Sequence, residues 1–422
     1  MTDTTKSIYV FENWSAGPPR RIGILYVDHI KGGEHLSFEY DPDYLRNGDS
    51  RVVLDPDLSF YPGRQYAGNK PYFGFFSDSA PDRWGRMLIK RREAIIARNE
   101  GRKPRTLTET DYLLGVYDET RMGALRFSLD DGATFLSDDR SDAAPPFTTL
   151  RQLEEAARNF EKNEDPFNDK WLKQLLVPGS SLGGARPKAT VRDTDGSFWI
   201  AKFPSKHDEN DSGAWEKVTH DLAVLAGLNV PPAKLQKYSS SGSTFLVKRF
   251  DRCGSQRIHF MSAMTALGES DGASSADGVS YLQIADFIRS NGCCPADDLI
   301  ELWKRVVFNM AVSNTDDHLR NHGFLLTKNG WRLSPAYDVN PNPGGEMLAL
   351  NVNEESNLID FEIALDAARY FGIPSDAGRK LAEEICDAVS LNWEGFAKRC
   401  GISRDNIELM RPAFPEKGKQ IK

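Results

Sequence analysis

The order of strand and helix patterns along the chain constrains its fold more than any other feature of the sequence. Two strand-like segments within residues 189–203 flank the dipeptide Asp195-Gly196, which is a strong signal for a tight β-hairpin. A helical pattern follows at 214–226, and a second hairpin pattern occupies 233–249. The middle of the chain therefore predicts two hairpins separated by one helix.

The pattern becomes largely helical after residue 281. One β interruption lies at 323–333, where the dipeptide Asn329-Gly330 favours a turn. Helices are expected at 281–290, 299–313, 361–370, 375–391 and 393–399. A β-rich part with one helix, followed by a mainly helical part, is the element order of a protein kinase. We therefore expect an α+β, two-lobed protein-kinase-like fold with an N-terminal β-rich subdomain and a helical C-terminal lobe.

The first part of the chain has the pattern of mixed β structure with turns. A strand is expected at 21–30, and residues 36–40 are expected to pair with it. A helix is expected at 82–98, because the segment Ser79-Ala80-Pro81-Asp82 places an N-cap candidate and a proline at its start.

A polar stretch at 137–146 has the composition of a linker or exposed loop, and we place the first domain boundary there. A helix is expected after it at 149–160. A chain of 422 residues is long enough for two or three domains of about 150 residues each. The expected domains are a β-rich subdomain at 1–147, a kinase N-lobe with a glycine-rich loop at 148–250, and a helical C-lobe at 251–422.

Charge limits the classes of partner. The formal net charge is −8, from 53 Lys and Arg against 61 Asp and Glu. Phosphate contacts need a basic surface, so a chain this acidic is not expected to be a general nucleic-acid binder. One basic cluster lies on the expected helix at 82–98, and a solvated helix face is its favoured interpretation: Arg83, Arg86, Lys90, Arg91 and Arg92.

Cysteine and hydropathy patterns indicate the compartment. The five cysteines are scattered, and their odd number and spacing favour neither a disulfide framework nor a zinc site. The sequence has no stretch near the ~18 consecutive apolar residues of a membrane helix, and its polar start is unlike a signal peptide. We therefore expect a cytoplasmic protein with no membrane partner.

Phosphoryl transfer needs a phosphate cradle, a lysine on the phosphates, a group that orients the nucleophile, and metal ligands. Asp316 and Asn321 stand at D-x-x-x-x-N spacing, as in a kinase catalytic loop, where the Asp takes or orients the hydroxyl proton and the Asn binds Mg²⁺. The usual His-Arg before the aspartate is absent. Asp338 follows the expected hairpin, as the second Mg²⁺ ligand of kinases does; a turn-capping role is the alternative.

Two further segments suit ATP binding. Lys202 lies in an apolar strand, where a kinase keeps its phosphate-binding lysine, and Glu216 on the next helix is a candidate partner. The alternative is a strand-edge lysine whose ammonium group stays in water. The segment 245–252, with Lys248 and Phe250, lies where a kinase hinge would offer backbone groups to adenine.

The glycine-rich segment 178–188 is the candidate phosphate cradle. Gly183 and Gly184 let backbone N–H groups approach phosphate oxygens. Further donors come from Ser180, Ser181, Arg186 and Lys188. The segment matches neither of the common glycine-rich nucleotide motifs, so an ordinary loop is the alternative.

Taken together, these segments resemble the HipA toxins of bacterial toxin–antitoxin systems. The resemblance is carried by SSLGGARPKA, WIAKFPS, LVKRFDR, NTDDHLRNHGFLL and LSPAYDV, with FSDSAPDRWGR ahead of the kinase core. It implies a serine/threonine protein kinase that uses ATP and Mg²⁺. By position it makes Asp316 the catalytic base and Asn321 and Asp338 the Mg²⁺ ligands. The ATP-binding residues implied are Ser181, Gly183, Gly184, Lys188, Lys202, Lys248 and Phe250.

The resemblance also implies regulation and partners. Ser181, or its neighbour Ser180, matches the loop serine that family members phosphorylate on themselves, which ejects the loop and stops ATP binding. Asp317 lies beside Asp316, and only the spacing to Asn321 favours the latter. Substrates in the family are aminoacyl-tRNA synthetases, and the usual partner is a small helix-turn-helix antitoxin, HipB-like, that binds operator DNA. An acidic toxin would reach DNA only indirectly, through that partner.

Other functions stay open. His318 and His322 stand four residues apart and, with Asp316 and Asp317, form a candidate transition-metal site of a hydrolase. A non-enzyme alternative is a catalytically silent scaffold or corepressor in a toxin–antitoxin–DNA complex. A kinase of small molecules on the same fold is a third alternative, since nothing in the sequence identifies the acceptor.

Overall fold

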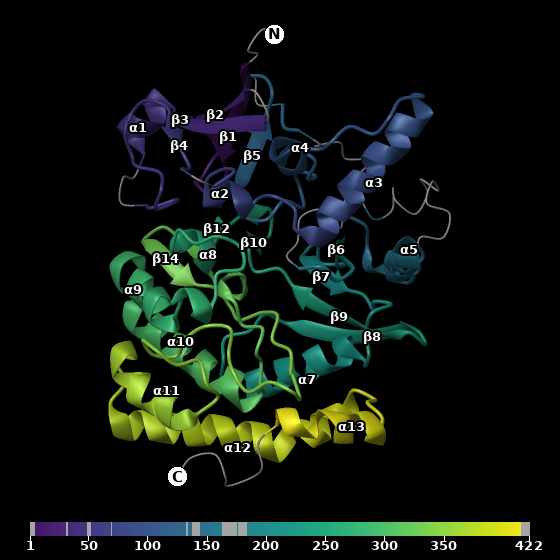
Figure 1. Cartoon of the computed structure of the whole chain (residues 1–422), viewed down its shortest axis with the longest axis vertical. Coiled ribbons are helices and arrows are strands. Elements are labelled where there is room, and N and C mark those ends of the chain that lie inside the picture. Colours follow the sequence, from purple (N-terminus) through teal and green to yellow (C-terminus); the bar gives the residue numbers. More distant parts are fainter. Residues whose placement is uncertain are drawn as a thin grey trace. The chain divides into compact units, whose positions relative to one another are not determined.

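The computed structural model describes residues 5–30, 33–48, 52–68, 70–131, 134–136, 144–162, 175 and 184–414. The chain divides into two compact units, and Figure 1 labels the elements of both. Unit 1 comprises Met1–Lys206 and Arg249–Met261, and unit 2 comprises His207–Lys248 and Ser262–Lys422. The three domains expected from the sequence, with boundaries at 147 and 250, stay a prediction.

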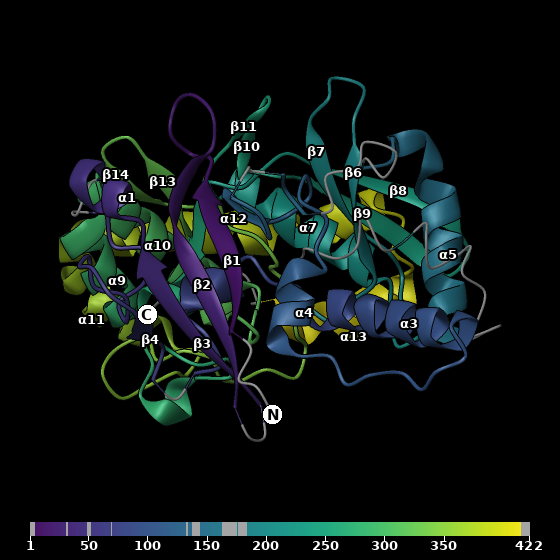
Figure 2. The ribbon, with the colours of Figure 1, turned by 90° about the horizontal axis from the view of Figure 1, so that it is seen from above.

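Unit 1 begins with a five-stranded antiparallel sheet in the order β4-β3-β2-β1-β5. Figure 2 shows three of these strands, β1 to β3, side by side. The predicted strand at 21–30 and its pairing with 36–40 are confirmed, since Leu25 lies opposite Phe38. The strands are β1 (Thr5–Glu12), β2 (Arg20–Ile30), β3 (Gly33–Tyr40), β4 (Gln65–Tyr66) and β5 (Leu125–Ser128).

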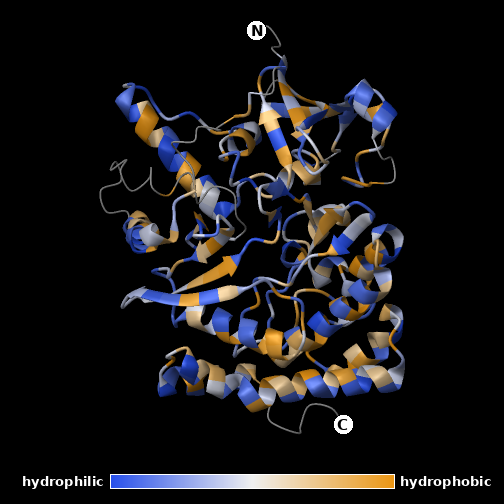
Figure 3. Ribbon diagram, turned by 180° about the vertical axis from the view of Figure 1, so that it is seen from behind, coloured by the Kyte–Doolittle hydropathy of each residue, from blue (hydrophilic) through white to orange (hydrophobic). Residues whose placement is uncertain are grey.

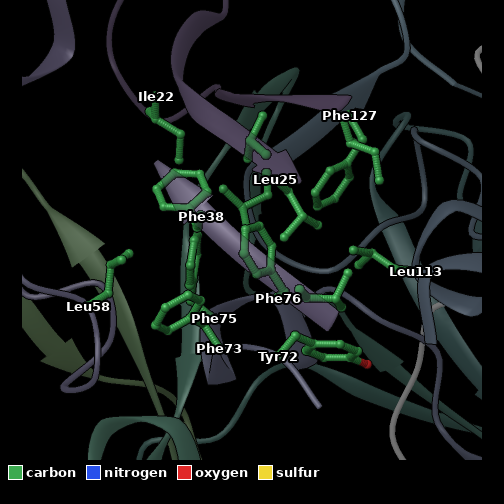
Figure 4. Close-up of a cluster of buried hydrophobic side chains, with 14 of the residues drawn as sticks. Ile22, Leu25, Phe38, Leu58, Tyr72, Phe73, Phe75, Phe76, Leu113 and Phe127 are labelled. Atoms are coloured by element: carbon green, nitrogen blue, oxygen red, sulfur yellow. The ribbon is translucent and has the colours of Figure 1, made fainter. Parts of the chain in front are cut away.

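Aromatic side chains fill the core of this sheet, as Figure 4 shows. The ring centroid of Phe38 lies 5.7 Å from that of Phe75 and 5.6 Å from that of Phe76, both edge to face. Leu25 and Phe127 complete the cluster, and each is at most 1% exposed. Burial of large apolar side chains is the main stabilising contribution here, and it fixes the short helix α2 (Gly74–Ser77) against the sheet.

Helix α3 (Arg83–Asn99) confirms the predicted helix at 82–98. Asp82 is its N-cap, and the Asp82 carboxylate accepts a hydrogen bond of 3.1 Å from the backbone N–H of Gly85. The predicted helix at 149–160 is α5. The remaining helices of unit 1 are α1 (Pro42–Asn47), α4 (Glu109–Leu114), the 3-10 turn η2 (Phe147–Thr149) and α5 (Leu150–Lys162).

The predicted hairpin around Asp195-Gly196 is formed by β6 (Lys188–Arg192) and β7 (Phe198–Lys202). Gly196 adopts φ +83°, the left-handed conformation that the turn requires. The second stretch of unit 1, Arg249–Met261, contributes β10 (Arg252–Cys253) and β11 (Gln256–Arg257). The strand β12 (Phe260–Ser262) lies where the chain passes into unit 2.

Unit 2 confirms the helical pattern after residue 281 and both remaining hairpins. Its strands are β8 (Ala233–Ser239) paired with β9 (Gly242–Lys248), and β13 (Gly323–Thr327) paired with β14 (Gly330–Leu333). Its α-helices are α7 (Ser212–Leu225), α8 (Ala263–Ala266), α9 (Tyr281–Asn291), α10 (Pro295–Ala311), α11 (Phe361–Ala367), α12 (Ser375–Arg399) and α13 (Arg404–Met410). The 3-10 turns are η3 (Ser275–Asp277), η4 (Leu319–Asn321), η5 (Ala368–Phe371) and η6 (Arg411–Ala413).

One prediction about these helices is wrong. The segments 375–391 and 393–399 are not separate helices, because α12 runs without a break through Asn392. The Asn392 side-chain amide donates back to the Ala388 carbonyl (2.9 Å), and Trp393 is held in the core by stacking on Phe414, with ring centroids 4.5 Å apart. Figure 3 shows hydrophobic and hydrophilic residues interleaved along α12, as expected of a helix with one buried face.

Across the described ranges, no helix combines the length and the apolar character needed to cross a membrane.

Candidate active site

The polar run 314–321 begins where α10 ends. The helix is anchored in the core of unit 2 by Leu302, Trp303 and Val307, none of which is exposed. Ser313 adopts φ +48°, and the backbone N–H of Asn314 bonds to the carbonyl of Asn309 (2.8 Å). The chain therefore leaves the helix in a tight, hydrogen-bonded turn, and the run starts from a fixed point.

Asp316 and Asn321 lie together within this run. Asp316 is exposed, whereas Asn321 is 6% exposed at the end of η4. The side-chain nitrogen of Asn321 donates to the backbone carbonyl of Asp316 (2.8 Å). Because the nitrogen is the donor, the side-chain oxygen of Asn321 is the atom left to face a cation.

Asp338 follows β14, as the sequence predicted, and it has an unusual backbone conformation. Its φ is +58°, which costs free energy for a residue other than glycine and is found mainly at turns and functional sites. The Asn340 side-chain amide donates to the Asp338 carboxylate (3.3 Å). Aspartate also adopts this conformation in turns, so the turn-capping alternative and the metal-ligand role both stay predictions.

Hydrogen bonds on both sides of Asp338 tie its segment to the polar run. Tyr337 donates its hydroxyl to the carbonyl of Arg320 (2.7 Å), and Asn342 donates its backbone N–H to the carbonyl of Ser313 (3.1 Å). Partial desolvation, together with the negative charge of Asp338, raises the pKa of Asp316 above its ordinary value. Asp316, Asn321 and Asp338 therefore form one constellation within unit 2.

The donor set of this constellation fits a small hard cation. Mg²⁺ prefers carboxylate and amide oxygens, and Asn321 and Asp338 supply one of each. Desolvation and, to a smaller extent, repulsion by Asp338 raise the pKa of Asp316, and a positive charge placed between the carboxylates would relieve the repulsion.

Asp317, the neighbour of Asp316, is a different kind of residue. It is 3% exposed, and a single carboxylate oxygen accepts hydrogen bonds from Tyr281 (2.6 Å), Asn309 (2.6 Å) and His322 (2.8 Å). Burial by itself raises the pKa of Asp317, but the charge and hydrogen bond of His322 bring it below the ordinary value. Asp317 is therefore an internal acceptor rather than a group that can meet substrate.

The histidines do not assemble the metal site that the hydrolase alternative needs. His322 is bonded to Asp317 inside the protein, away from the exposed Asp316. Within the described ranges, no three His, Cys, Asp or Glu side chains come close enough together to hold a metal ion.

The lysines predicted to contact phosphate lie in unit 1. Lys188 and Lys202 face each other across the β6–β7 hairpin. Lys188 is only 3% exposed, and its ammonium group lies 3.4 Å from the carboxylate of Asp82. Lys202 is half-buried. The predicted pairing of Lys202 with Glu216 stays a prediction.

The glycine-rich segment is described only from Gly184 onward. Ser180, Ser181 and Gly183 lie outside the described residues. Gly184 adopts φ +92°, and a Cβ placed there would approach the Lys188 ammonium nitrogen to 3.0 Å. Glycine thus permits both the backbone conformation and the close approach to Lys188.

The two hinge candidates fall in different units. Lys248 ends β9 in unit 2, and its backbone N–H bonds to the Pro232 carbonyl (2.9 Å). Phe250 is half-buried in unit 1, with its ring 6.1 Å from that of Phe260. Their predicted role at adenine stays a prediction.

The sequence did not identify the residues that support these groups. The segment 79–82 was recognised as a helix start, but it gave no sign that Asp82 meets Lys188, which is 106 positions away. Tyr281 and Asn309 lie in ordinary amphipathic helices, and nothing local marks them as partners of Asp317. A polar residue on the apolar face of a helix is the one sequence signal that could have drawn attention to Asn309.

Comparison with known proteins identifies the family of the chain. A family model described as "HipA-like C-terminal domain" matches residues 180–393. Y4mE of Sinorhizobium fredii, a protein named as a proposed kinase, is 31% identical over 218 residues, which cover 48% of this chain and 43% of Y4mE. The serine/threonine-protein kinase toxin HipA of Shewanella oneidensis is 26% identical over 227 residues, covering 46% and 50%.

Structural similarity to known proteins covers more of this chain than sequence similarity does. A chain in the structure of the Shewanella oneidensis MR-1 HipA, HipB and operator DNA complex has a TM-score of 0.66 and 18% identity, covering 96% of this chain and 94% of that one. The α+β fold expected from the sequence is thereby confirmed. The chain spans about half the length of the curated relatives it matches (43% and 50% of the two named above). Since the family model covers half of the chain, the protein belongs to the family defined by the HipA-like C-terminal domain.

Proposed function

We propose that this protein is an ATP- and Mg²⁺-dependent serine/threonine protein kinase that acts as the toxin of a toxin–antitoxin module. The observation that carries the proposal is the constellation of Asp316, Asn321 and Asp338 in unit 2. An exposed carboxylate beside two hard-oxygen donors is the arrangement that phosphoryl transfer to a hydroxyl requires.

Asp316 acts on the acceptor. A serine or threonine hydroxyl attacks the γ-phosphorus, the bond to the ADP oxygen breaks, and Asp316 takes the hydroxyl proton. Partial desolvation and the nearby carboxylates raise its pKa, which makes it a stronger base than an ordinary aspartate. Mg²⁺, when held by Asn321 and Asp338, neutralises charge on the phosphates.

The glycine-rich segment and the lysines of unit 1 bind the nucleotide in this proposal. Lys202 and Lys188 contact the phosphates, Gly183 and Gly184 bring backbone N–H groups to them, and Lys248 and Phe250 flank the adenine. Ser181, or Ser180, is the site of autophosphorylation. A phosphoserine in the cradle would repel the nucleotide, so this modification would stop ATP binding.

The proposed partner is a helix-turn-helix antitoxin of the HipB type. Support comes from the structural match to a complex that contains HipA, HipB and operator DNA. The net charge of −8 favours contact with DNA through the antitoxin rather than directly. The proposed substrate is a component of translation, such as an aminoacyl-tRNA synthetase, met in the cytoplasm.

The test is transfer of labelled phosphate. The purified chain, first shown to be unphosphorylated, is incubated with Mg²⁺ and γ-labelled ATP beside Asp316→Ala, and phosphosites are mapped by mass spectrometry. Asp376→Asn, an exposed carboxylate in the first turn of α12, serves as the control. Label on Ser180 or Ser181 that Asp316→Ala abolishes and Asp376→Asn retains is the expected result.

Nucleotide binding without transfer to itself or to added synthetases would favour the silent scaffold. Retention of label in Asp316→Ala would refute the role given to Asp316.

A further inference from the structure

A buried carboxylate lies directly behind the proposed catalytic residues. One oxygen of Asp317 accepts hydrogen bonds from the start of α9 (Tyr281, 2.6 Å), from α10 (Asn309, 2.6 Å) and from the residue after Asn321 (His322, 2.8 Å). All three donors are almost fully buried, with exposures of 0%, 3% and 1%. Three elements of unit 2 thus converge on a single atom.

A packing role alone does not account for this choice of side chain. A buried carboxylate loses its hydration, and an apolar residue of similar size fills a core position without that cost. The polar run 314–322 contains only one short 3-10 turn and a few isolated backbone hydrogen bonds, so side-chain hydrogen bonds add to what holds its position. Asp317 is adjacent in the chain to Asp316, and through His322 it holds the neighbour of Asn321.

The carboxylate is also the last acceptor of a chain of amide hydrogen bonds. Because a carboxylate only accepts, Asn309 must present its nitrogen to Asp317 and its oxygen to the other side. That oxygen accepts from the side-chain nitrogen of Asn314 (3.0 Å), which leaves the Asn314 oxygen to accept the backbone N–H of Asn340 (3.4 Å). The side-chain amide of Asn340 donates to the Asp338 carboxylate (3.3 Å).

Asn309 and Asn314 each have a single orientation that satisfies both neighbours. The backbone N–H of Asn340 can only donate, so it fixes the Asn314 oxygen toward itself and thereby the Asn309 nitrogen toward Asp317. Position 317 must therefore present an acceptor to Asn309; a carboxylate always does so, whereas an amide could turn its own donor toward Asn309.

We propose that Asp317 is a positioning residue: its carboxylate holds Asn321 through His322, and it is the acceptor that anchors the Asn309–Asn314 amide chain, which joins the segment of Asp338 at the backbone of Asn340. The separation of Asp316, Asn321 and Asp338 is thereby set before nucleotide binds. The role deepens the proposed kinase function and rests on it. Asp317 touches none of the reacting groups.

Asp317→Asn tests the role, with Asp298→Asn as its matched control. Asp298 is a carboxylate of unit 2 with the same exposure (3%), but it accepts from Arg332 and the backbone of Leu333 rather than from the polar run. The measurements are kcat, the KM for ATP, the melting temperature, and the affinity for a non-hydrolysable ATP analogue with and without Mg²⁺.

The expected result separates positioning from stability. Both variants lose thermal stability, but only Asp317→Asn lowers kcat, by about 10- to 100-fold, while its KM for ATP changes little. The strengthening of analogue binding by Mg²⁺ falls by a similar factor in Asp317→Asn alone. Tyr281→Phe, which removes one donor, gives a smaller loss of kcat.

A second substitution, which moves the negative charge from position 317 to position 309, is expected to restore kcat. In the double variant Asp317→Asn with Asn309→Asp, the carboxylate stands at the other end of the same hydrogen bond, and position 309 still accepts from Asn314. Recovery of kcat in this protein is expected. If Asp317→Asn does not fold, the comparison of Tyr281→Phe with wild type, by kcat and by Mg²⁺-dependent analogue binding, decides the matter.

A kcat in Asp317→Asn within about twofold of wild type, with Asp316→Ala inactive, would overturn the positioning role and leave the kinase proposal intact. A wild-type protein without phosphoryl transfer would count against the kinase proposal instead. The Mg²⁺-dependent binding of the analogue would then still report whether Asp317 shapes the site.

Discussion

Asp316 and Asp317 are neighbours in the chain with opposite environments. Asp316 is exposed and its pKa is raised by partial desolvation and by Asp338, whereas Asp317 is buried and its pKa is lowered by His322 despite its burial. From the sequence, only the spacing to Asn321 favoured Asp316. Burial favours the same residue for an independent reason, because a carboxylate enclosed by three donors cannot reach a substrate hydroxyl.

His259 is a second ionisable residue in an unusual environment, because it is buried. It is 1% exposed in unit 1, its ring stacks on Trp14 with centroids 4.6 Å apart, and burial lowers its pKa to about 3. The folded state therefore holds His259 neutral at pH values where the unfolded chain protonates it.

This makes stability depend on pH in a defined direction. His259 contributes stability above the unfolded pKa of about 6.5, and the contribution is lost as pH falls toward the folded pKa of about 3. At pH 5 the loss relative to pH 7.5 should be about 2 kcal/mol. His259→Phe keeps a ring on Trp14 but binds no proton, so its free energy of unfolding should fall less over this range.

Urea unfolding of both proteins at pH 7.5 and pH 5 measures the difference. An equal loss of stability in wild type and variant would contradict the prediction and assign the acid sensitivity to other groups.

At the scale of elements, the start of α3 supports the hairpin β6–β7. Asp82 caps α3 with one carboxylate oxygen, and the other faces the ammonium group of Lys188 at 3.4 Å. Trp84, in the first turn of α3, donates its indole N–H to the Lys188 carbonyl (3.0 Å). The helix start thus holds the strand that follows the glycine-rich segment.

Two substitutions at Asp82 separate its two contacts. Asp82→Asn keeps an oxygen for the cap but loses the charge that faces Lys188, whereas Asp82→Ala loses both. The alanine variant should be less stable than the asparagine variant by about 1 kcal/mol, the usual contribution of an N-cap. Both should raise the KM for ATP, since Lys188 is a proposed phosphate contact.

Urea midpoints and initial rates at varied ATP check this. Equal stability of the two variants would mean that the cap contributes nothing, and an unchanged KM would argue against a link between Asp82 and the nucleotide.

At the scale of the whole chain, buried arginines join distant parts of unit 1. Arg249 and Asp251 form an ion pair of 2.7 Å in which both side chains are 1% exposed. Asp251 also accepts from Arg252 (2.6 Å) and from the backbone N–H of Gly123, 128 positions away. Burial alone would raise the pKa of Asp251, but the two guanidinium groups lower it well below its ordinary range.

Loss of this carboxylate should therefore be costly. Asp251→Asn removes the negative charge from a buried pair and leaves Arg249 without its counter-charge, which should lower the free energy of unfolding by about 3–5 kcal/mol. Asp286→Asn, which breaks the exposed ion pair with Arg289, should change it by less than about 0.5 kcal/mol. Urea unfolding of the three proteins compares them, and similar losses in both variants would refute the role of burial.

The sequence by itself determined those elements whose signals are local. Asp195-Gly196 and Asn329-Gly330 predicted their hairpins, and the segment 79–82 predicted the start of α3, because turns and caps depend on residues within a few positions of one another. The spacing of Asp316 and Asn321 was equally local, and it selected the residues on which the proposed function rests.

The tertiary structure decided everything that depends on burial and on distant partners. The sequence pattern split α12 at Asn392, yet the helix is whole, and Trp393 just beyond this point packs on the distant Phe414. Only the fold encloses Asp317 among donors from α9 and α10, and only the fold brings Lys188 to Asp82. A side chain's local pattern fixes its backbone preference, but its charge state and its contacts depend on which distant residues exclude water from it.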